Sequence, residues 1–236
     1  MSRTGKAQRV LKQVAAAPTS RRAQYSRSTR EALLDAAIGL FSSQGYAGTS
    51  LDVVVAEARV TKGALYHHYK GKQGLFEAAF ARQEEQASAL VQRAVDEVDD
   101  PWEKAGAGMR AFLEACRDPA YRRIVVQEGP AVLGYERFRD RERLSAYAIV
   151  HDIVERVIAD TGLEIGPDMV DTFTRIFHGA VSAAGESVVE DVDPVVAGIR
   201  VDAVIGFMLL GMRTAAQSPD AEAMADLARQ LSDGSS

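Results

Sequence analysis

Hydrophobic residues recur at helical spacing through most of the chain. In the N-terminal part, Leu34, Ile38 and Phe41 repeat every three to four positions until Gly45, a residue type that often ends helices. No stretch alternates apolar and polar residues around a tight turn dipeptide, as β-hairpins require. The pattern therefore predicts an all-α protein with nine to ten helices and no internal repeat.

Capping residues mark where these helices begin. Proline follows Asp, Gly or Ser at five places, and proline suits a first helical position because its missing N–H would have no partner there. These pairs predict helix starts near residues 101, 119, 167, 194 and 219. Ser28 and Glu31 have the spacing of a capping box and predict the start of the first helix.

Three further helices are predicted in the N-terminal part. The second runs from Thr49 or Ser50 to about Ala58, and the third is a short helix over 62–69 capped by Thr61. The fourth starts after Gly71 and continues to about residue 98. The sequence thus predicts two short helices followed by a long one.

Charge divides the chain into two parts. Up to Arg82 there are 13 basic and five acidic side chains, and the remainder has 15 basic and 28 acidic ones. The N-terminal part therefore carries +8 and the rest −13, which is typical of a polyanion-binding segment joined to an acidic domain. One cysteine, Cys116, excludes a disulfide framework and fits a reducing cytosol.

Residues 49–76 carry the most specific pattern, TSLDVVVAEARVTKGALYHHYKGKQGLF. Two short helices joined by a tight turn form a helix-turn-helix, whose second helix enters the DNA major groove. On that helix Leu65 and Tyr69 face inward with Val60. Gly63 and Ala64 face outward, and their small size allows a close approach to DNA. The free N–H groups at the start of the helix can bind phosphate.

This pattern closely resembles the TetR family of bacterial transcriptional regulators over roughly residues 28–80. The resemblance implies a homodimer that binds a palindromic double-stranded operator, with a C-terminal domain for a small-molecule effector and for dimerisation. It divides the chain into a flexible basic arm (1–27), a DNA-binding domain (28–75) and a ligand-binding and dimerisation domain (76–236). The residues it places at DNA, with Arg30 added from the first helix, are Arg30, Thr49, Thr61, Lys62, Gly63, Ala64, Tyr66, His67, His68 and Lys72.

The chain departs from the family pattern at Arg59, where the turn usually has glycine. A left-handed backbone at this residue would cost about 1 kcal/mol or more. Tyr66 is ambiguous for a different reason, because its ring could pack inward beside Leu65. These two positions are where the structure is most informative.

Two other function classes compete with a regulator. A helical enzyme or a ligand-binding protein without operator binding would show no affinity for DNA, and the sequence offers no catalytic or cofactor motif in a suitable context. A nucleoid-type DNA binder would not need the 150 residues that follow Arg82. His67 and His68 are not expected to bind metal, because neighbouring helical side chains point about 100° apart. The sequence thus predicts neither enzyme activity nor a cofactor.

Two uncharged stretches, 176–185 and 203–212, predict a subunit interface. A helix that is apolar on nearly all sides must be covered on both faces, either by its own core and a second copy or inside a fully internal hairpin. Small residues that would permit close approach are Gly179, Ala180, Ala183, Ala184, Gly206 and Gly211. Both stretches are shorter than the roughly 20 residues of a membrane span. The expectation is a cytoplasmic homodimer without a membrane partner.

The effector pocket is expected between about 101 and 188, as the resemblance implies. An apolar pocket with a few polar groups is the usual design, so the expected ligand is a hydrophobic molecule, with a cationic one as a variant of it. The candidate lining residues are Trp102, Phe112, Cys116, Glu128, Leu133, Tyr147, His151, Phe177 and Glu186, with the two glutamates as polar anchors. Ligand binding is expected to release the protein from DNA by tilting the long helix over 72–98.

Deleting residues 1–25 is expected to weaken operator binding most at low salt. The arm carries six basic side chains and no acidic one, and each phosphate that it neutralises adds about 0.9 to the slope of log affinity against log salt. The base preference should not change, because the positions near 62–67 are untouched. Titrations at several salt concentrations measure both quantities, and an unchanged slope would show that the arm is inert.

Overall fold

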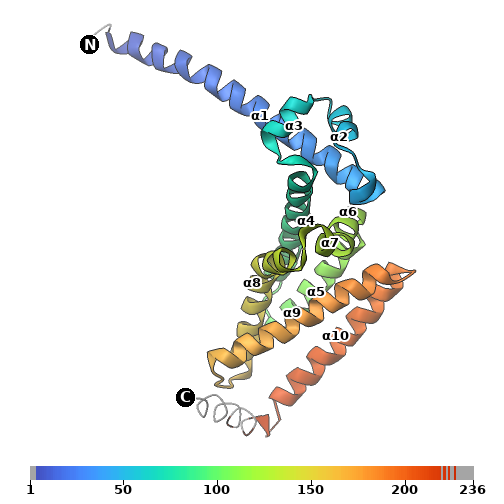
Figure 1. Ribbon diagram of the computed structural model, residues 1–236. Coiled ribbons are helices and arrows are strands. Elements are labelled where there is room, and N and C mark those ends of the chain that lie inside the picture. The colour runs from blue at the N-terminus through green and yellow to red at the C-terminus, as the bar shows by residue number, and fades with distance from the viewer. Residues whose placement is uncertain (1–3, 219, 222, 224–225, 227–236) are drawn as a thin grey trace. The chain divides into compact units, whose positions relative to one another are not determined.

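The computed structural model describes residues 4–218, 220, 221, 223 and 226, with side chains outside 4–22, 135, 139 and 142–145. The described part contains ten α-helices, one π-helix and no strand, which confirms the all-α prediction (Figure 1). The helices are α1 (Thr4–Gly48), α2 (Leu51–Glu57), α3 (Lys62–His68), α4 (Gly71–Asp96), α5 (Pro101–Arg117), α6 (Pro119–Tyr121), η1 (Arg122–Gln127), α7 (Gly129–Leu133), α8 (Tyr135–Thr161), α9 (Pro167–Glu190) and α10 (Pro194–Ala216).

Four of the five proline-marked starts are confirmed. Prolines 101, 119, 167 and 194 are the first residues of α5, α6, α9 and α10. Asp100 shows the mechanism: one carboxylate oxygen accepts hydrogen bonds from the backbone N–H groups of Trp102 (2.8 Å) and Glu103 (3.0 Å). The start expected near 219 lies outside the described residues.

The helix start predicted from the capping box at Ser28 is wrong, because α1 already begins at Thr4 and runs through Ser28. Once a helix has formed, each added residue extends it at little cost, and 19–30 contain no glycine or proline to stop it. The break at Gly45 is confirmed: its φ of 75° lies in the left-handed region that glycine adopts easily. The flexibility expected for the basic arm over 1–27 stays a prediction.

The chain forms two compact units, Met1–Ala79 and Phe80–Ser236, and the division falls within α4. The first unit has its own core, in which the rings of Phe41 and Phe76 meet edge to face at 5.2 Å. Its other fully buried side chains include Leu33, Val54, Leu65 and Leu75. This core holds α2 and α3 against α1.

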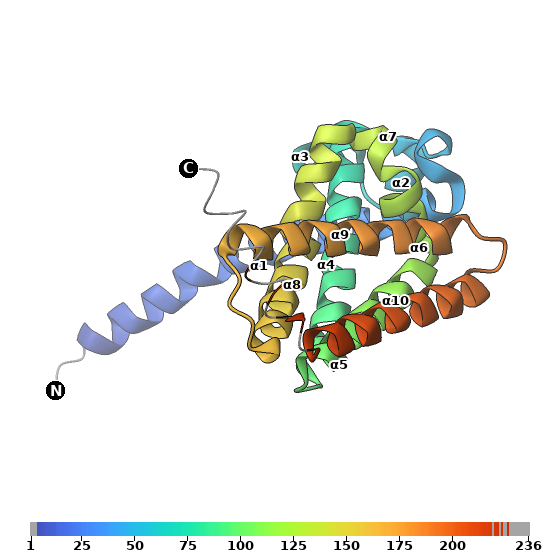
Figure 2. The ribbon, with the colours of Figure 1, turned by 90° about the horizontal axis from the view of Figure 1, so that it is seen from below.

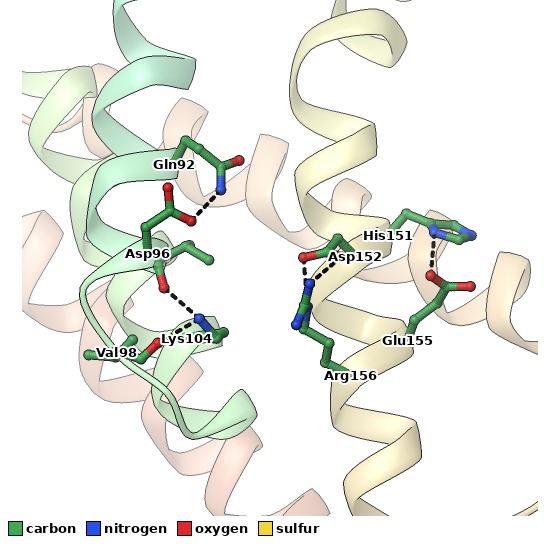
Figure 3. A network of polar contacts seen from close by, with 9 residues as sticks. Gln92, Asp96, Val98, Lys104, His151, Asp152, Glu155 and Arg156 are labelled. Carbon is green, nitrogen blue, oxygen red and sulfur yellow. Dashed lines mark hydrogen bonds and ion pairs between the residues drawn. The ribbon is translucent and has the colours of Figure 1, made fainter.

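In the second unit α5 packs against α8, α9 and α10, and α9 lies beside α10 (Figures 1 and 2). The close contact of α9 with α5 requires glycine at 185, since a Cβ there would lie 2.9 Å from the Phe112 ring. At the α4–α5 corner the Lys104 ammonium donates to the carbonyls of Val95 (2.8 Å) and Val98 (2.5 Å), which closes the end of α4 (Figure 3).

Candidate nucleic-acid interface and cavity

The helix-turn-helix in the first unit is held by two hydroxyl caps. Ser50 Oγ accepts from the N–H of Val53 (3.3 Å) and Thr61 Oγ1 accepts from that of Ala64 (3.2 Å), so each short helix begins at a defined residue. Leu65 and Tyr69 are buried as expected. The Tyr69 hydroxyl donates to the backbone carbonyl of Arg30 at 3.1 Å and ties α3 to α1.

The outer surface of α3 is formed by the side chains that the sequence places there. Lys62, Gly63 and His67 are exposed, while Ala64 and His68 are half-buried. The Tyr66 side chain is 62% exposed, so its ring does not pack inward with Leu65. α3 thus presents an aromatic ring and a cation beside a bare stretch of backbone.

Glycine at position 63 is not required by the packing of the protein itself. A Cβ there would meet only Thr61 Oγ1, at an unstrained 3.9 Å, and Gly63 has ordinary helical φ. Any requirement for a small residue must therefore come from a molecule that approaches α3 from outside.

Two basic side chains flank α3. The Lys62 ammonium lies 2.5 Å from the carboxylate of Asp52 on α2, and this hydrogen bond raises the pKa of Lys62. Lys72, at the start of α4, donates to the carbonyl of Ala47 at 3.4 Å and lies 4.4 Å above the Tyr46 ring. The Lys62 ammonium is thus held at α2, and the Lys72 ammonium is held at the end of α1.

His68 lies between His67 and Arg30, and its imidazole pKa is lowered. Burial is the largest cause, followed by repulsion from His67 and from Arg30, because each of them disfavours the charged form. Near neutral pH His68 is therefore uncharged and can act at this surface as a hydrogen-bonding group. Arg30 itself is exposed on α1.

Thr49 is the one expected contact that the structure does not bring to this surface. Its side chain is only 2% exposed, and its hydroxyl donates to the carbonyl of Gly45 at 2.8 Å. The same carbonyl also accepts a hydrogen bond from the backbone N–H of Thr49 at 3.2 Å. Thr49 therefore closes the end of α1 and is not available as a side-chain contact.

Arg59 has φ of 54° and is the one non-glycine residue with positive φ in the described chain. The left-handed turn is therefore formed by a residue with a Cβ. Replacing Arg59 with glycine is expected to raise the free energy of unfolding by about 1 kcal/mol, because glycine removes this strain. Urea denaturation measures the difference. Arg59→Ala is the control: it keeps a Cβ, and an equal gain from it would contradict the explanation.

The second unit encloses a cavity of about 620 Å³ between α4, α5, α8, α9 and α10. Four of the nine expected residues line it: Trp102, Phe112, Phe177 and Glu186. Sequence reasoning missed the α4 side of the cavity, which Glu84, Ala87, Ser88 and Val91 supply. These residues recur every three to four positions, and this helical spacing could have indicated that they share one face of α4.

The other five expected residues lie elsewhere. Cys116 and Leu133 are buried outside the cavity lining, and Glu128 pairs with Arg123 at 3.0 Å. The Tyr147 hydroxyl donates to Asp171 at 3.3 Å, and His151 lies 3.6 Å from Glu155 (Figure 3). Each was chosen by residue type on a helix of unknown rotation, and the packing turned it away from the cavity.

Carboxylates are the charged groups of the cavity wall. Glu84 is 9% exposed, and Glu186 lies on α9. Ser182 and His178 add polar atoms to a wall that is otherwise mostly apolar. No lysine or arginine lines the cavity among the side chains that the structure describes.

The Cys116 thiol is expected to be inert in the folded protein. Burial raises its pKa to about 12 from an ordinary value of 9.0, so at pH 8 the thiolate fraction falls roughly 1,000-fold. A disulfide reagent should react with the Cys116 thiol only after unfolding.

The raised pKa of Cys116 also implies that the free energy of unfolding falls as pH rises above 9, because the thiol ionises in the unfolded state before it does in the folded state. Rapid labelling of the native protein would contradict this burial.

α9 and α10 expose an apolar surface on the second unit. Phe207 on α10 is 79% exposed, and the other exposed apolar side chains of the two helices include Ile176, Ile199, Val204, Met208 and Leu210. The alternative of a fully internal hairpin is therefore wrong. Among the small residues, Gly179, Ala183, Gly206 and Gly211 are exposed, whereas Ala184 is buried against the unit's own core.

By length and composition, α10 is the one helix of the described chain that could cross a membrane, with 11% of its most apolar stretch buried. This is weak evidence, since it ignores packing. Asp202 lies 3.9 Å from Arg110 on α5, and Arg213 donates to Asp100 at 3.1 Å. α10 also packs against α5 and α9 of the same unit.

Comparison with known proteins places both units in one family. A family model described as bacterial regulatory proteins of the tetR family matches residues 33–79, and one for the tetracyclin repressor-like C-terminal domain matches 102–212. The chain belongs to the tetR family. It is therefore a transcriptional regulator with an N-terminal DNA-binding helix-turn-helix and a C-terminal helical domain.

Individual relatives agree with this assignment. The regulator is 29% identical over 141 residues to the transposon Tn10 TetC protein of Escherichia coli, covering 58% of this chain and 70% of the relative. It is 22% identical to the regulator SrpR of Pseudomonas putida, covering 68% and 75%. A tetR-family regulator from Pectobacterium atrosepticum has a similar structure, with a TM-score of 0.68, 29% identity, and 80% and 95% coverage.

Proposed function

We propose that this regulator is a cytoplasmic repressor that binds a palindromic operator as a homodimer and is released by a small molecule. The observation that carries the proposal is the outer surface of α3, where an exposed ring and ammonium flank a glycine that the protein's own packing does not require. The DNA major groove is a binding site that a helix must approach this closely in order to reach the base edges. We assign it no catalytic step.

The proposed DNA contacts keep nine of the ten residues expected from the sequence. Gly63 and Ala64 allow backbone approach, Tyr66 and His67 face base edges, and the N–H groups after Thr61 face a phosphate. The full set is Arg30, Thr61, Lys62, Gly63, Ala64, Tyr66, His67, His68 and Lys72. Thr49 is left out because its hydroxyl is bonded within the protein.

The proposed effector is a largely apolar molecule that is neutral or carries a cationic end. Support comes from the mostly apolar wall and from two carboxylates, with no described basic side chain among the lining residues. Glu84 and Val91 belong to α4, the helix that also begins in the DNA-binding unit. A ligand that displaces this helix would move the recognition helices off the roughly 34–36 Å spacing of successive major grooves.

Selection from a random duplex pool followed by ligand titration tests the proposal. The purified protein should enrich a palindromic sequence, and a thermal-shift screen with apolar amines and matched carboxylic acids should favour the amines. Because coupling between sites is reciprocal, operator DNA should weaken ligand binding by the same factor. Failure to enrich any sequence would overturn operator binding, and equal ligand affinity with and without operator would overturn release by ligand.

A further inference from the structure

We propose that Asp52 is a counter-charge built into the DNA-reading surface, which neutralises Lys62 and thereby suppresses sequence-independent DNA binding. The inference rests on the proposed function and assigns a specificity-determining role to a residue outside the expected contacts. It is carried by the 2.5 Å contact between the Asp52 carboxylate and the Lys62 ammonium.

The pair lies where α2 and α3 begin. Asp52 is in the first turn of α2, and Lys62 is the first residue of α3, directly after its cap Thr61. Both side chains remain largely open to solvent, at 67% and 62% exposure. The contact therefore does not serve the core of the unit, and an exposed ion pair of this kind adds little to stability.

The Asp52–Lys62 pair changes the charge that this surface presents to the DNA backbone. Sequence-independent binding comes essentially from basic side chains that neutralise phosphates and release the counterions condensed on the DNA. A phosphate that approaches Lys62 meets a carboxylate 2.5 Å from the ammonium, well within the screening length of about 8–10 Å at physiological salt. The pair as a whole carries no net charge, so Lys62 adds little to this attraction while Asp52 holds it.

Operator binding depends less on this one charge. There the regulator also gains base-edge contacts from Tyr66 and its neighbours on α3, which random DNA does not supply in the correct register. Removing the Asp52 charge should therefore strengthen binding to random DNA more than binding to operator. Asp52 thus raises the ratio of the affinity for operator to the affinity for random DNA.

Asp52→Asn tests the inference on the full-length protein, with Glu57→Gln as the matched control. Glu57 ends α2 and is exposed, so this variant removes the same charge from the same helix away from Lys62. The probes are a labelled random-sequence 30-bp duplex and an operator duplex from the selection, titrated between about 0.1 and 1 M salt. Each additional neutralised phosphate steepens the slope by about 0.9, or about eightfold in affinity over this range, so one per protomer amounts to about 1.8 for a dimer.

We expect Asp52→Asn to bind the random duplex more tightly with a steeper slope, to gain less on operator, and to exceed Glu57→Gln on both measures. The gain should disappear in a Lys62→Met background. Equal gains from Asp52→Asn and Glu57→Gln, or a gain that persists without Lys62, would overturn the inference and leave the proposed function standing. Absence of DNA binding by the wild-type protein would overturn both. Equal thermal midpoints of the variants exclude misfolding.

Discussion

Phe207→Glu is expected to convert the regulator from a dimer into a monomer and to abolish operator binding at concentrations where the wild type is saturated. Phe207 is 79% exposed on α10, which carries further exposed apolar side chains that a second copy would cover. A twofold interface contains the substitution twice, and burying each unpaired carboxylate costs several kcal/mol. A monomer then binds only one half-site of the operator at a time, and the affinity gained from binding both half-sites together is lost. Sedimentation and operator titration measure the two effects.

The matched control for this variant is Ala148→Glu. Ala148 is exposed on α8, so it accepts the same charge away from the α9 and α10 surface. It should remain a dimer and bind operator normally. A Phe207→Glu protein that stays dimeric and binds DNA would show that a different surface joins the subunits.

Changes at Gly63 are expected to affect stability and DNA binding in opposite directions. Gly63→Ala should leave the free energy of unfolding unchanged or raise it by up to about 1 kcal/mol, because alanine is the better helix former and has room. Operator affinity should fall, and Gly63→Leu should lose roughly 10- to 100-fold, in line with about 1–3 kcal/mol for a disrupted groove contact. Urea denaturation and operator titration give both numbers.

Gly39→Ala provides the comparison for Gly63. Gly39 is an exposed glycine within α1 with no atom near its missing Cβ, so alanine should stabilise the helix there as well. It lies outside the proposed contacts and should leave operator affinity unchanged. Unchanged operator binding by Gly63→Leu would show that α3 does not approach DNA closely at this residue.

Local chemistry explains which elements were predictable. Asp100 and Asp193 cap the helices that follow them with their own side chains. The proline after each has no backbone N–H, so no donor is left without an acceptor at the first helical position. Gly45 and Arg59 adopt the left-handed backbone that their places in the pattern indicated. In each case the interactions join residues within a few positions of one another.

Where prediction failed, the residue type was suitable but the surrounding structure gave the residue another place or role. Ser28 has capping chemistry but lies within α1, which begins upstream. Thr49 has the right residue type for a DNA contact but donates to Gly45. Tyr147 and His151 lie on α8, which lines the cavity with other residues, and the packing of this helix leaves these two outside the lining.

By itself, the sequence determined the helical class, most helix boundaries, the basic DNA-reading segment and the family resemblance, because periodicity, capping and charge act over one or two turns. Only the tertiary structure decided how each helix is rotated about its axis. That rotation exposes Tyr66 and Phe207, buries Ala184, and brings Glu84 to the cavity. It also places Asp52 against Lys62. Rotation is set by the sum of many contacts between helices distant in sequence, so residue types and spacing alone do not fix it.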